Sequence, residues 1–184
     1  MEEWRLAHAE STKLPEPRVL QRWKPSDEGW KKANSDGAVS KFGDKGGGGL
    51  VLRDHNGAFV AGSSHFDPNN ADPEAVEILA WRKAAQVARE MNIQKLHVEL
   101  DNQKVVQMLN LLPKDLRATG PWIEEIKEIL RGFEEVKVSW ARRSANIAAH
   151  KFARVDVGHE LCKVWLSIPS DFVLDVISDE IPNF

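Results

Sequence analysis

The 184-residue sequence contains a single cysteine and no long apolar run. With only Cys162, the chain cannot form an intrachain disulfide, which fits a reducing compartment. We expect this cysteine to be a small core residue of a helix. Spanning a bilayer takes roughly 18 consecutive apolar residues, and no stretch of the sequence approaches that length. The sequence therefore argues against a disulfide-stabilised secreted fold and against a membrane-spanning protein.

The N-terminus lacks the features of a secretory signal. Residues 1–10, MEEWRLAHAE, carry acids where a signal peptide has basic residues, and they lack its apolar segment. We therefore expect a soluble, intracellular monomer, in the nucleus or the cytoplasm, that does not bind a membrane. The length suits one domain with additional terminal segments. We assign residues 1–22 to an arm or linker, 23–170 to the domain and 171–184 to a tail that packs on it.

The chain also lacks a large excess of positive charge. A net charge of −3 argues against a protein that coats nucleic acid by charge alone. The segment from Val136 to Arg154, however, contains no acid and five basic residues, which are Lys137, Arg142, Arg143, Lys151 and Arg154. A basic edge of this kind is compatible with a polyanion held near metal ions, and a solvated charged surface is the plain alternative.

The hydrophobic patterns predict an α/β fold with the element order βββ-α-β-α-α-β-α. The dipeptide Asn56-Gly57 between two apolar runs is a strong hairpin signal, so the first three strands should form an antiparallel meander. Asp72 and Pro73 are typical of a helix start. The predicted strands are Trp30–Ala38, Leu50–Arg53, Ala58–Ala61, Gln94–Asp101 and Val136–Trp140, and the predicted helices are Pro73–Met91, Val105–Leu111, Pro121–Gly132 and one from Ser144 or Asn146 to Trp165.

Three segments are predicted to be loops: Phe42–Gly49, Ser63–Asp72 and Leu112–Thr119. The first of them ends in four consecutive glycines. A phosphate-binding P-loop would require a following Lys-Ser/Thr, which is missing. Close packing of a strand together with a flexible turn is the favoured interpretation.

Three acids occur in an order that can bring them together. Asp36 lies on the first strand, Glu77 follows on the edge of the apolar stripe of the first long helix, and Asp101 ends the fourth strand. Each alone has an ordinary explanation: a turn Asp, a partly exposed helix Glu, a strand-end Asp. Together, converging carboxylates repel one another unless a divalent cation lies between them. Hard oxygen ligands favour Mg²⁺ or Mn²⁺, and paired ions of this kind hydrolyse phosphodiesters.

Several motifs in fixed order resemble the type 1 ribonuclease H fold, and within it the RNase H-like domains related to plant non-LTR retroelements. They cover about residues 23–170 and comprise Trp23-Lys-Pro25, Asn34-Ser-Asp-Gly-Ala38, Gly48-Gly-Leu-Val-Leu-Arg-Asp54, Glu77-Ile-Leu-Ala80, Val98-Glu-Leu-Asp101, Arg142-Arg-Ser-Ala-Asn146 with Ala149-His150, and Val164-Trp165. The resemblance implies a five-stranded mixed sheet flanked by helices, with parallel strands added to the meander. It also implies metal-dependent cleavage of the RNA strand of an RNA·DNA hybrid.

The resemblance carries specific roles onto this chain. Asp36, Glu77 and Asp101 match the first three metal-site acids, while His150 stands where many relatives have a fourth Asp. It implies two Mg²⁺ or Mn²⁺ ions, bridged by Asp36, with His150 as a ligand of one. The candidates for contact with nucleic acid are Asn34, Gly37, Arg142, Arg143 and Asn146.

Alternatives remain open at this point. Replacement of an Asp by His150 also suits a catalytically weak or inactive module that binds a hybrid or RNA, and the apolar tail suits a protein-interaction domain. His97 and Glu99 share a strand face with Asp101, so a second metal set there is possible. Of the tryptophans, only Trp81 and Trp140 are kept as candidate stacking platforms.

Overall fold

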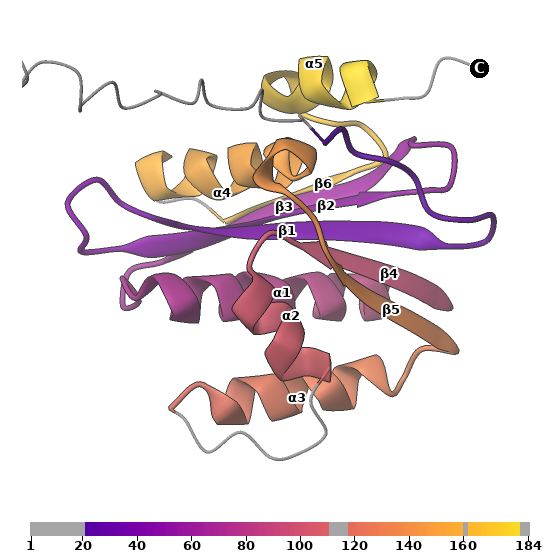
Figure 1. Cartoon of the computed structure of the whole chain (residues 1–184). Coiled ribbons are helices and arrows are strands. Elements are labelled where there is room, and N and C mark those ends of the chain that lie inside the picture. Colours follow the sequence, from indigo (N-terminus) through magenta and orange to yellow (C-terminus); the bar gives the residue numbers. More distant parts are fainter. Residues whose placement is uncertain (1–20, 111–117, 160–161, 181–184) are drawn as a thin grey trace, which may run out of the picture.

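A computed structural model describes residues 21–110, 118–159 and 162–180 of the chain. Almost all of the predicted arm 1–22, most of the predicted loop 112–119 and the last residues of the tail therefore lie outside the described residues. The described part forms a central mixed sheet with helices on both faces (Figure 1).

The sheet confirms the predicted strand directions but has six strands instead of five. Its order is β5-β4-β1-β2-β3-β6. The first three strands are antiparallel neighbours, and β4 and β5 are added in parallel beside β1. β6 pairs antiparallel with β3 at the other side of the sheet. The strand bounds are β1 Lys31–Val39, β2 Gly46–Arg53, β3 Phe59–Asp67, β4 Lys95–Leu100, β5 Glu135–Trp140 and β6 Lys163–Leu166.

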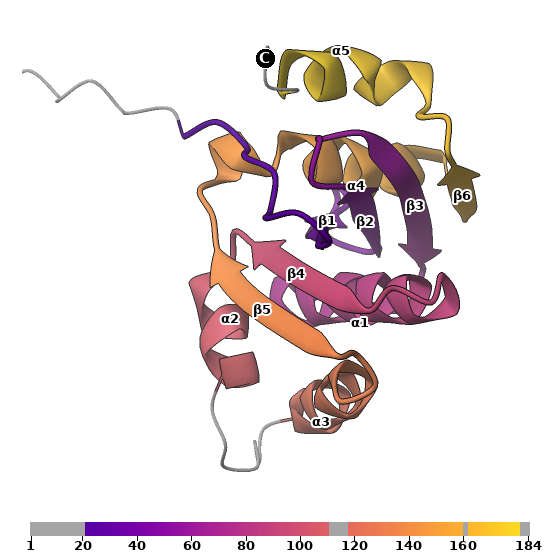
Figure 2. The ribbon, with the colours of Figure 1, turned by 90° about the vertical axis from the view of Figure 1, so that its right-hand side faces the viewer.

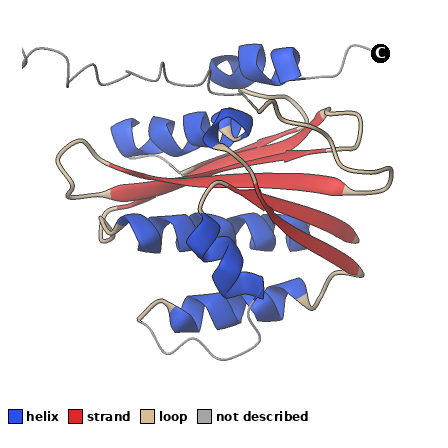
Figure 3. Cartoon of the chain, viewed as in Figure 1, coloured by secondary structure: helices blue, strands red, loops and turns tan. Residues whose placement is uncertain are grey.

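The helices form two layers around this sheet (Figures 2 and 3). α1 and α4 pack on opposite faces of β1 and β2, α3 packs outside α1, and α5 packs outside α4. Within the described part, no helix has the length and apolar character needed to cross a membrane. The bounds are α1 Pro73–Glu90, α2 Gln103–Asn110, α3 Gly120–Leu130, α4 Ile147–His159 and α5 Asp171–Glu180, with a 3₁₀ turn η1 at Arg143–Ala145.

Local sequence explains where α1 begins and which face it buries. The Asp72 side chain accepts a hydrogen bond from the backbone N–H of Ala75 at 2.7 Å, and Pro73 occupies the first turn. Trp81 and Ala84, on the apolar stripe, are fully buried against the sheet. The predicted helix is therefore confirmed, with its end one residue before Met91.

The predicted glycine loop is wrong in its second half, because Gly46–Gly49 form the start of the central strand β2. A Cβ on Gly48 would lie 2.6 Å from the Cβ of Ala80 in α1, and a Cβ on Gly49 would overlap the backbone of Ala149 and Ala153 in α4. The glycines alternate between the two faces and let both helices approach the strand closely.

Two other boundaries differ from the prediction. β3 continues to Asp67, so the first part of the predicted loop Ser63–Asp72 is strand. α4 ends at His159, and Trp165 belongs to β6 rather than to a helix. Cys162 is exposed and precedes β6, which corrects its expected place in a helix core. Pairing of β6 with β3 replaces the helical turns that the apolar residues suggested.

Buried polar contacts attach both ends of the described chain to the sheet. The Arg53 guanidinium stacks on Trp23 at 3.5 Å from the ring centroid and forms an ion pair with Glu180 of α5 at 2.5 Å. Val173 and Ile177 of α5 are buried against α4. The apolar face of the tail helix is therefore used within the molecule, which weakens the alternative of a tail-mediated interaction domain.

We predict that Gly49→Ala destabilises the fold by about 3 kcal/mol, because the added methyl group would push α4 off the sheet. Chemical denaturation measures the free energy of unfolding. Gly132→Ala is the matched control, since its nearest neighbour is the Ile129 carbonyl oxygen at 3.2 Å. A Gly49→Ala protein as stable as the control variant would contradict the close-packing explanation.

Candidate active site

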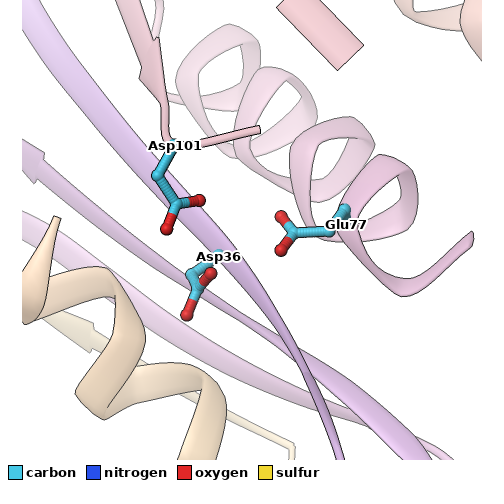
Figure 4. Close-up of side chains that lie close together, drawn as sticks. All are labelled: Asp36, Glu77 and Asp101. Carbon is cyan, nitrogen blue, oxygen red and sulfur yellow. The ribbon is translucent and has the colours of Figure 1, made fainter. Parts of the chain in front are cut away.

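Three carboxylates meet where β1, α1 and β4 come together. Asp36 lies on β1, Glu77 in the second turn of α1, and Asp101 directly after β4. One ligand oxygen from each lies within 4.8 Å of the others, and Figure 4 shows the three side chains pointing toward one another. Gly37 permits this approach, because a Cβ there would lie 2.7 Å from the backbone nitrogen of Glu77.

The convergence of these acids is electrostatically costly without a cation. Burial, together with the charges of Asp36 and Asp101, raises the pKa of Glu77 to about 9. Burial and the charge of Asp36 also raise the pKa of Asp101, and Arg143 and His150 oppose that rise. In the metal-free protein Glu77 therefore retains its proton at neutral pH, which a bound divalent ion would displace.

On the same face of the sheet, the neighbouring acid Glu99 has hydrogen-bond partners for both carboxylate oxygens. Glu99 accepts hydrogen bonds from Lys32 at 3.0 Å and from Asn34 at 3.1 Å. Asp36, only 1% exposed, has one oxygen, Oδ1, with no hydrogen-bond partner among the described residues when Glu77 is ionised. A buried carboxylate oxygen without a partner, beside two further carboxylates, fits a hard divalent cation.

His150 and Arg143 lie beside Asp36. His150 Nδ1 lies 2.5 Å from Asp36 Oδ2, and Arg143 Nη2 lies 3.0 Å from the same ring nitrogen. The structure thus places His150 beside Asp36, and its role as a metal ligand stays a prediction. The described group of mutually close ligand atoms, however, consists of Asp36, Glu77 and Asp101.

The predicted contacts to nucleic acid fall into two classes. Asn34 and Asn146 are buried, which corrects their expected role. Asn34 contacts Trp23 and Glu99, while the Asn146 amide donates to the Ser35 carbonyl oxygen at 2.9 Å. In this structure both amides make contacts inside the fold, and their burial does not favour contact with nucleic acid. Three candidates keep access to solvent: Arg142 and Arg143 are exposed, and Gly37 is half-buried.

His97 and Glu99 do not extend the metal cluster. His97 contacts Ser26 and Ser139 through its two ring nitrogens, each at 2.7 Å. Burial, the largest influence, lowers the pKa of His97 to about 4. Since Lys32 and Asn34 occupy Glu99, this pair belongs to a satisfied hydrogen-bond network, and the alternative of a second metal set is not supported.

One tryptophan has a role that the sequence did not reveal. Trp81 is fully buried, so it cannot stack on a base. Trp140 is 40% exposed, and its indole N–H donates to the backbone carbonyl of Asp101 at 3.0 Å. The two residues stand at the ends of adjacent parallel strands. The sequence predicts one strand that ends at Asp101 and another that ends at Trp140. These two strand ends were the available signal for the contact.

Comparison with known proteins supports the fold. A family described as reverse transcriptase-like matches residues 34–155, and no curated protein matches the chain. The N-terminal RNase H domain of Rv2228c from Mycobacterium tuberculosis is 17% identical, with a TM-score of 0.64 over 70% of this chain and 94% of that one. RNase H1 from Halobacterium salinarum is 20% identical, with a TM-score of 0.64 over 72% and 99%.

A further similar structure is LC11-RNase H1 in complex with an RNA/DNA hybrid. It is 15% identical to this chain, with a TM-score of 0.64 over 71% of this chain and 98% of that one. At these identities the likeness shows a shared fold. The ribonuclease H fold implied by the sequence motifs is thereby confirmed.

We predict that the metal-free protein loses stability as the pH rises from about 7 to 9, above the range in which His97, whose pKa is lowered, acts in the opposite direction. Glu77 has a pKa near 4.5 when unfolded and about 9 when folded. The folded state therefore binds more protons across this window, and the free energy of unfolding falls with rising pH. Denaturation in EDTA at several pH values measures the slope. Glu77→Gln should flatten it, and an equal slope in both proteins would contradict the raised pKa.

Proposed function

This chain belongs to the reverse transcriptase-like family, and we propose that it is a ribonuclease H-type enzyme that cleaves the RNA strand of RNA·DNA hybrids with divalent metal ions. The observation that carries the proposal is the cluster of Asp36, Glu77 and Asp101, in which, with all three acids ionised, one buried oxygen has no partner among the described residues. Such a cluster is poorly suited to stabilising a fold, because its charges repel one another, and well suited to holding Mg²⁺ or Mn²⁺.

Some residues of the site would bind the cation, and others fix the positions of the binding carboxylates. Asp36 Oδ1, Glu77 and Asp101 would bind the cation, which when bound activates water and stabilises the leaving 3′ oxygen. Trp140 fixes the backbone of Asp101, and the backbone N–H of Gly37 donates to the Glu77 carboxylate. These contacts keep both carboxylates in place, so that binding the cation requires little rearrangement.

The hybrid substrate is supported by the surroundings of the site. A similar structure, LC11-RNase H1, was determined with an RNA/DNA hybrid. In this chain, the exposed Arg142 and Arg143 lie just before α4 and can contact phosphates. Selectivity for a hybrid requires reading 2′-hydroxyl groups across the minor groove. The exposed backbone and arginine groups are better placed for this than the buried Asn34 and Asn146.

A second candidate function is a module on the same fold that binds a hybrid or RNA without cutting it. The contact between His150 and Asp36 favours this alternative, since it occupies Asp36 Oδ2 with a protein group. The unpartnered Oδ1 favours the enzyme. Cleavage of a labelled hybrid distinguishes the two functions directly.

We predict cleavage of the RNA strand of a labelled hybrid with Mg²⁺ or Mn²⁺, none in EDTA, and no cleavage of duplex DNA. Asp36→Asn and Asp101→Asn should each slow cleavage by about a hundredfold or more, because each removes a charge that holds the cation. Gel analysis of the products gives the rates.

Glu74→Gln is the matched control, since Glu74 lies on the same helix one turn before Glu77. We expect it to cut at nearly the wild-type rate, whereas Glu77→Gln should not. Wild-type rates for both Asp variants would refute the assigned site. A wild-type protein that binds the hybrid but never cuts it would establish the binding module instead.

A further inference from the structure

A cavity of about 420 Å³, here called the β3–β6 cavity, lies between α1 and the strands β3 and β6. β6 is the outermost strand of the sheet beside β3 (Figure 2). The walls of the cavity come from β3, from the solvent side of α1 and from the start of β6, and none of the three acids of the candidate active site lines it. The β3–β6 cavity is therefore separate from that site.

Ser63 directs a buried hydroxyl group into this cavity. Ser63 is 1% exposed, and its Oγ has no hydrogen-bond partner among the described residues. The next residue, Ser64, donates from its Oγ to the Phe152 carbonyl oxygen in α4. Because successive side chains of a strand point to opposite faces, Ser63 faces the α1 side, where the cavity lies. A buried polar atom without a partner beside an open space indicates a ligand.

The charged residues of the β3–β6 cavity favour an anion. Asp67 is the only acid among the described residues that line it, and both of its carboxylate oxygens already accept hydrogen bonds from the following loop. Of the basic residues, Arg82 is paired with Glu125 at 3.3 Å, and Lys163 lies over an aromatic ring at 5.0 Å. Lys83 has no ion pair within the described part of the chain. Its ammonium group is therefore available to a negatively charged ligand.

The rest of the cavity wall suits an apolar body. It includes Leu79 of α1 and Val164 of β6, which is 52% exposed. Burial, followed by the charge of Lys83, lowers the pKa of His65, so this imidazole is uncharged at neutral pH. An apolar surface with one available cation and one free hydroxyl group fits a small organic anion.

Cys162, the only cysteine of the chain, lies in the same wall. Its Sγ accepts a hydrogen bond from the backbone N–H of Phe66 at 3.4 Å and lies 3.9 Å from the Phe66 carbonyl oxygen. These contacts hold the sulfur at the edge of the cavity, and the residue is exposed. A small molecule that enters the cavity can therefore meet the sulfur directly.

We propose that Cys162 is a site of reversible mixed-disulfide formation with small anionic disulfides, which Lys83 and Ser63 bind in the β3–β6 cavity. The Cys162 thiol first releases its proton to solvent. The thiolate then attacks one sulfur of the bound disulfide, whose S–S bond breaks while the new S–S bond forms, and the other half leaves as a thiolate. Cys162 is thereby oxidised and the departing sulfur is reduced. This modification does not depend on the proposed cleavage of hybrids.

Reaction of the full-length protein with two aromatic disulfides tests the proposal. Dithiobis(nitrobenzoate) carries two carboxylates, whereas dithiodipyridine is uncharged, and the absorbance of the released thiol gives each rate. The same two rates measured with mercaptoethanol correct for the intrinsic reactivity of the reagents. The anionic-to-neutral rate ratio of Cys162 should exceed that of mercaptoethanol about three- to tenfold and should fall with added salt. Cys162→Ser should release no thiol from either reagent.

Lys83→Gln should lower the rate ratio about threefold, and Ser63→Ala should lower it as well. Arg89→Gln is the matched control, since it removes an exposed positive charge from the same helix outside the cavity, and it should react like the wild type. A wild-type ratio equal to that of mercaptoethanol, or a Lys83→Gln protein with the wild-type ratio, would overturn the proposal, because Cys162 would then react as an ordinary exposed thiol. An adduct that dithiothreitol does not remove would also contradict it.

Discussion

The close approach of two helices to the central strands is the constraint on which the site depends. α1 and α4 press on opposite faces of β1 and β2, where Gly48 and Gly49 leave room for helix backbone and small side chains. Gly37 does the same for the turn of α1 that carries Glu77. Side chains larger than hydrogen at these positions would hold the helices away from the sheet. Glu77 and His150 could then not reach the carboxylate of Asp36.

The polar residues on one face of β1 and β4 illustrate two uses of charge in the same environment. Lys32 balances the charge of Glu99, and Asn34 donates to its other oxygen, so Glu99 belongs to a satisfied buried network. Asp36, on the same strand face, meets two more acids and one histidine. Because burying an unpaired charge is costly, the second arrangement persists only where a cation or a proton compensates it. This difference singles out Asp36, Glu77 and Asp101 as the candidate site.

The elements that the sequence predicted best are those with a local signal. The helix capped by Asp72 and the hairpin at Asn56-Gly57 needed only short-range patterns, and both occur as expected. The glycines of β2 were misassigned because glycine favours turns in isolation, and only the presence of a helix on each side explains them in a strand. The prediction that Trp165 lies in a helix was wrong for a related reason, since its apolar neighbours suit a helix or an edge strand equally.

The sequence by itself determined the order of the elements as far as α4 and the choice of Asp36, Glu77 and Asp101 as candidates, because helix phase and strand ends follow from local spacing. Only the tertiary structure decided which polar side chains are occupied. Asn34 and Glu99 are 65 positions apart, and Asp36 and His150 are 114 apart. Such pairings depend on strand order and helix position, which local patterns do not encode. The same limit applies to Arg142 and Arg143, which are adjacent and chemically identical, and which only the path of the chain distinguishes.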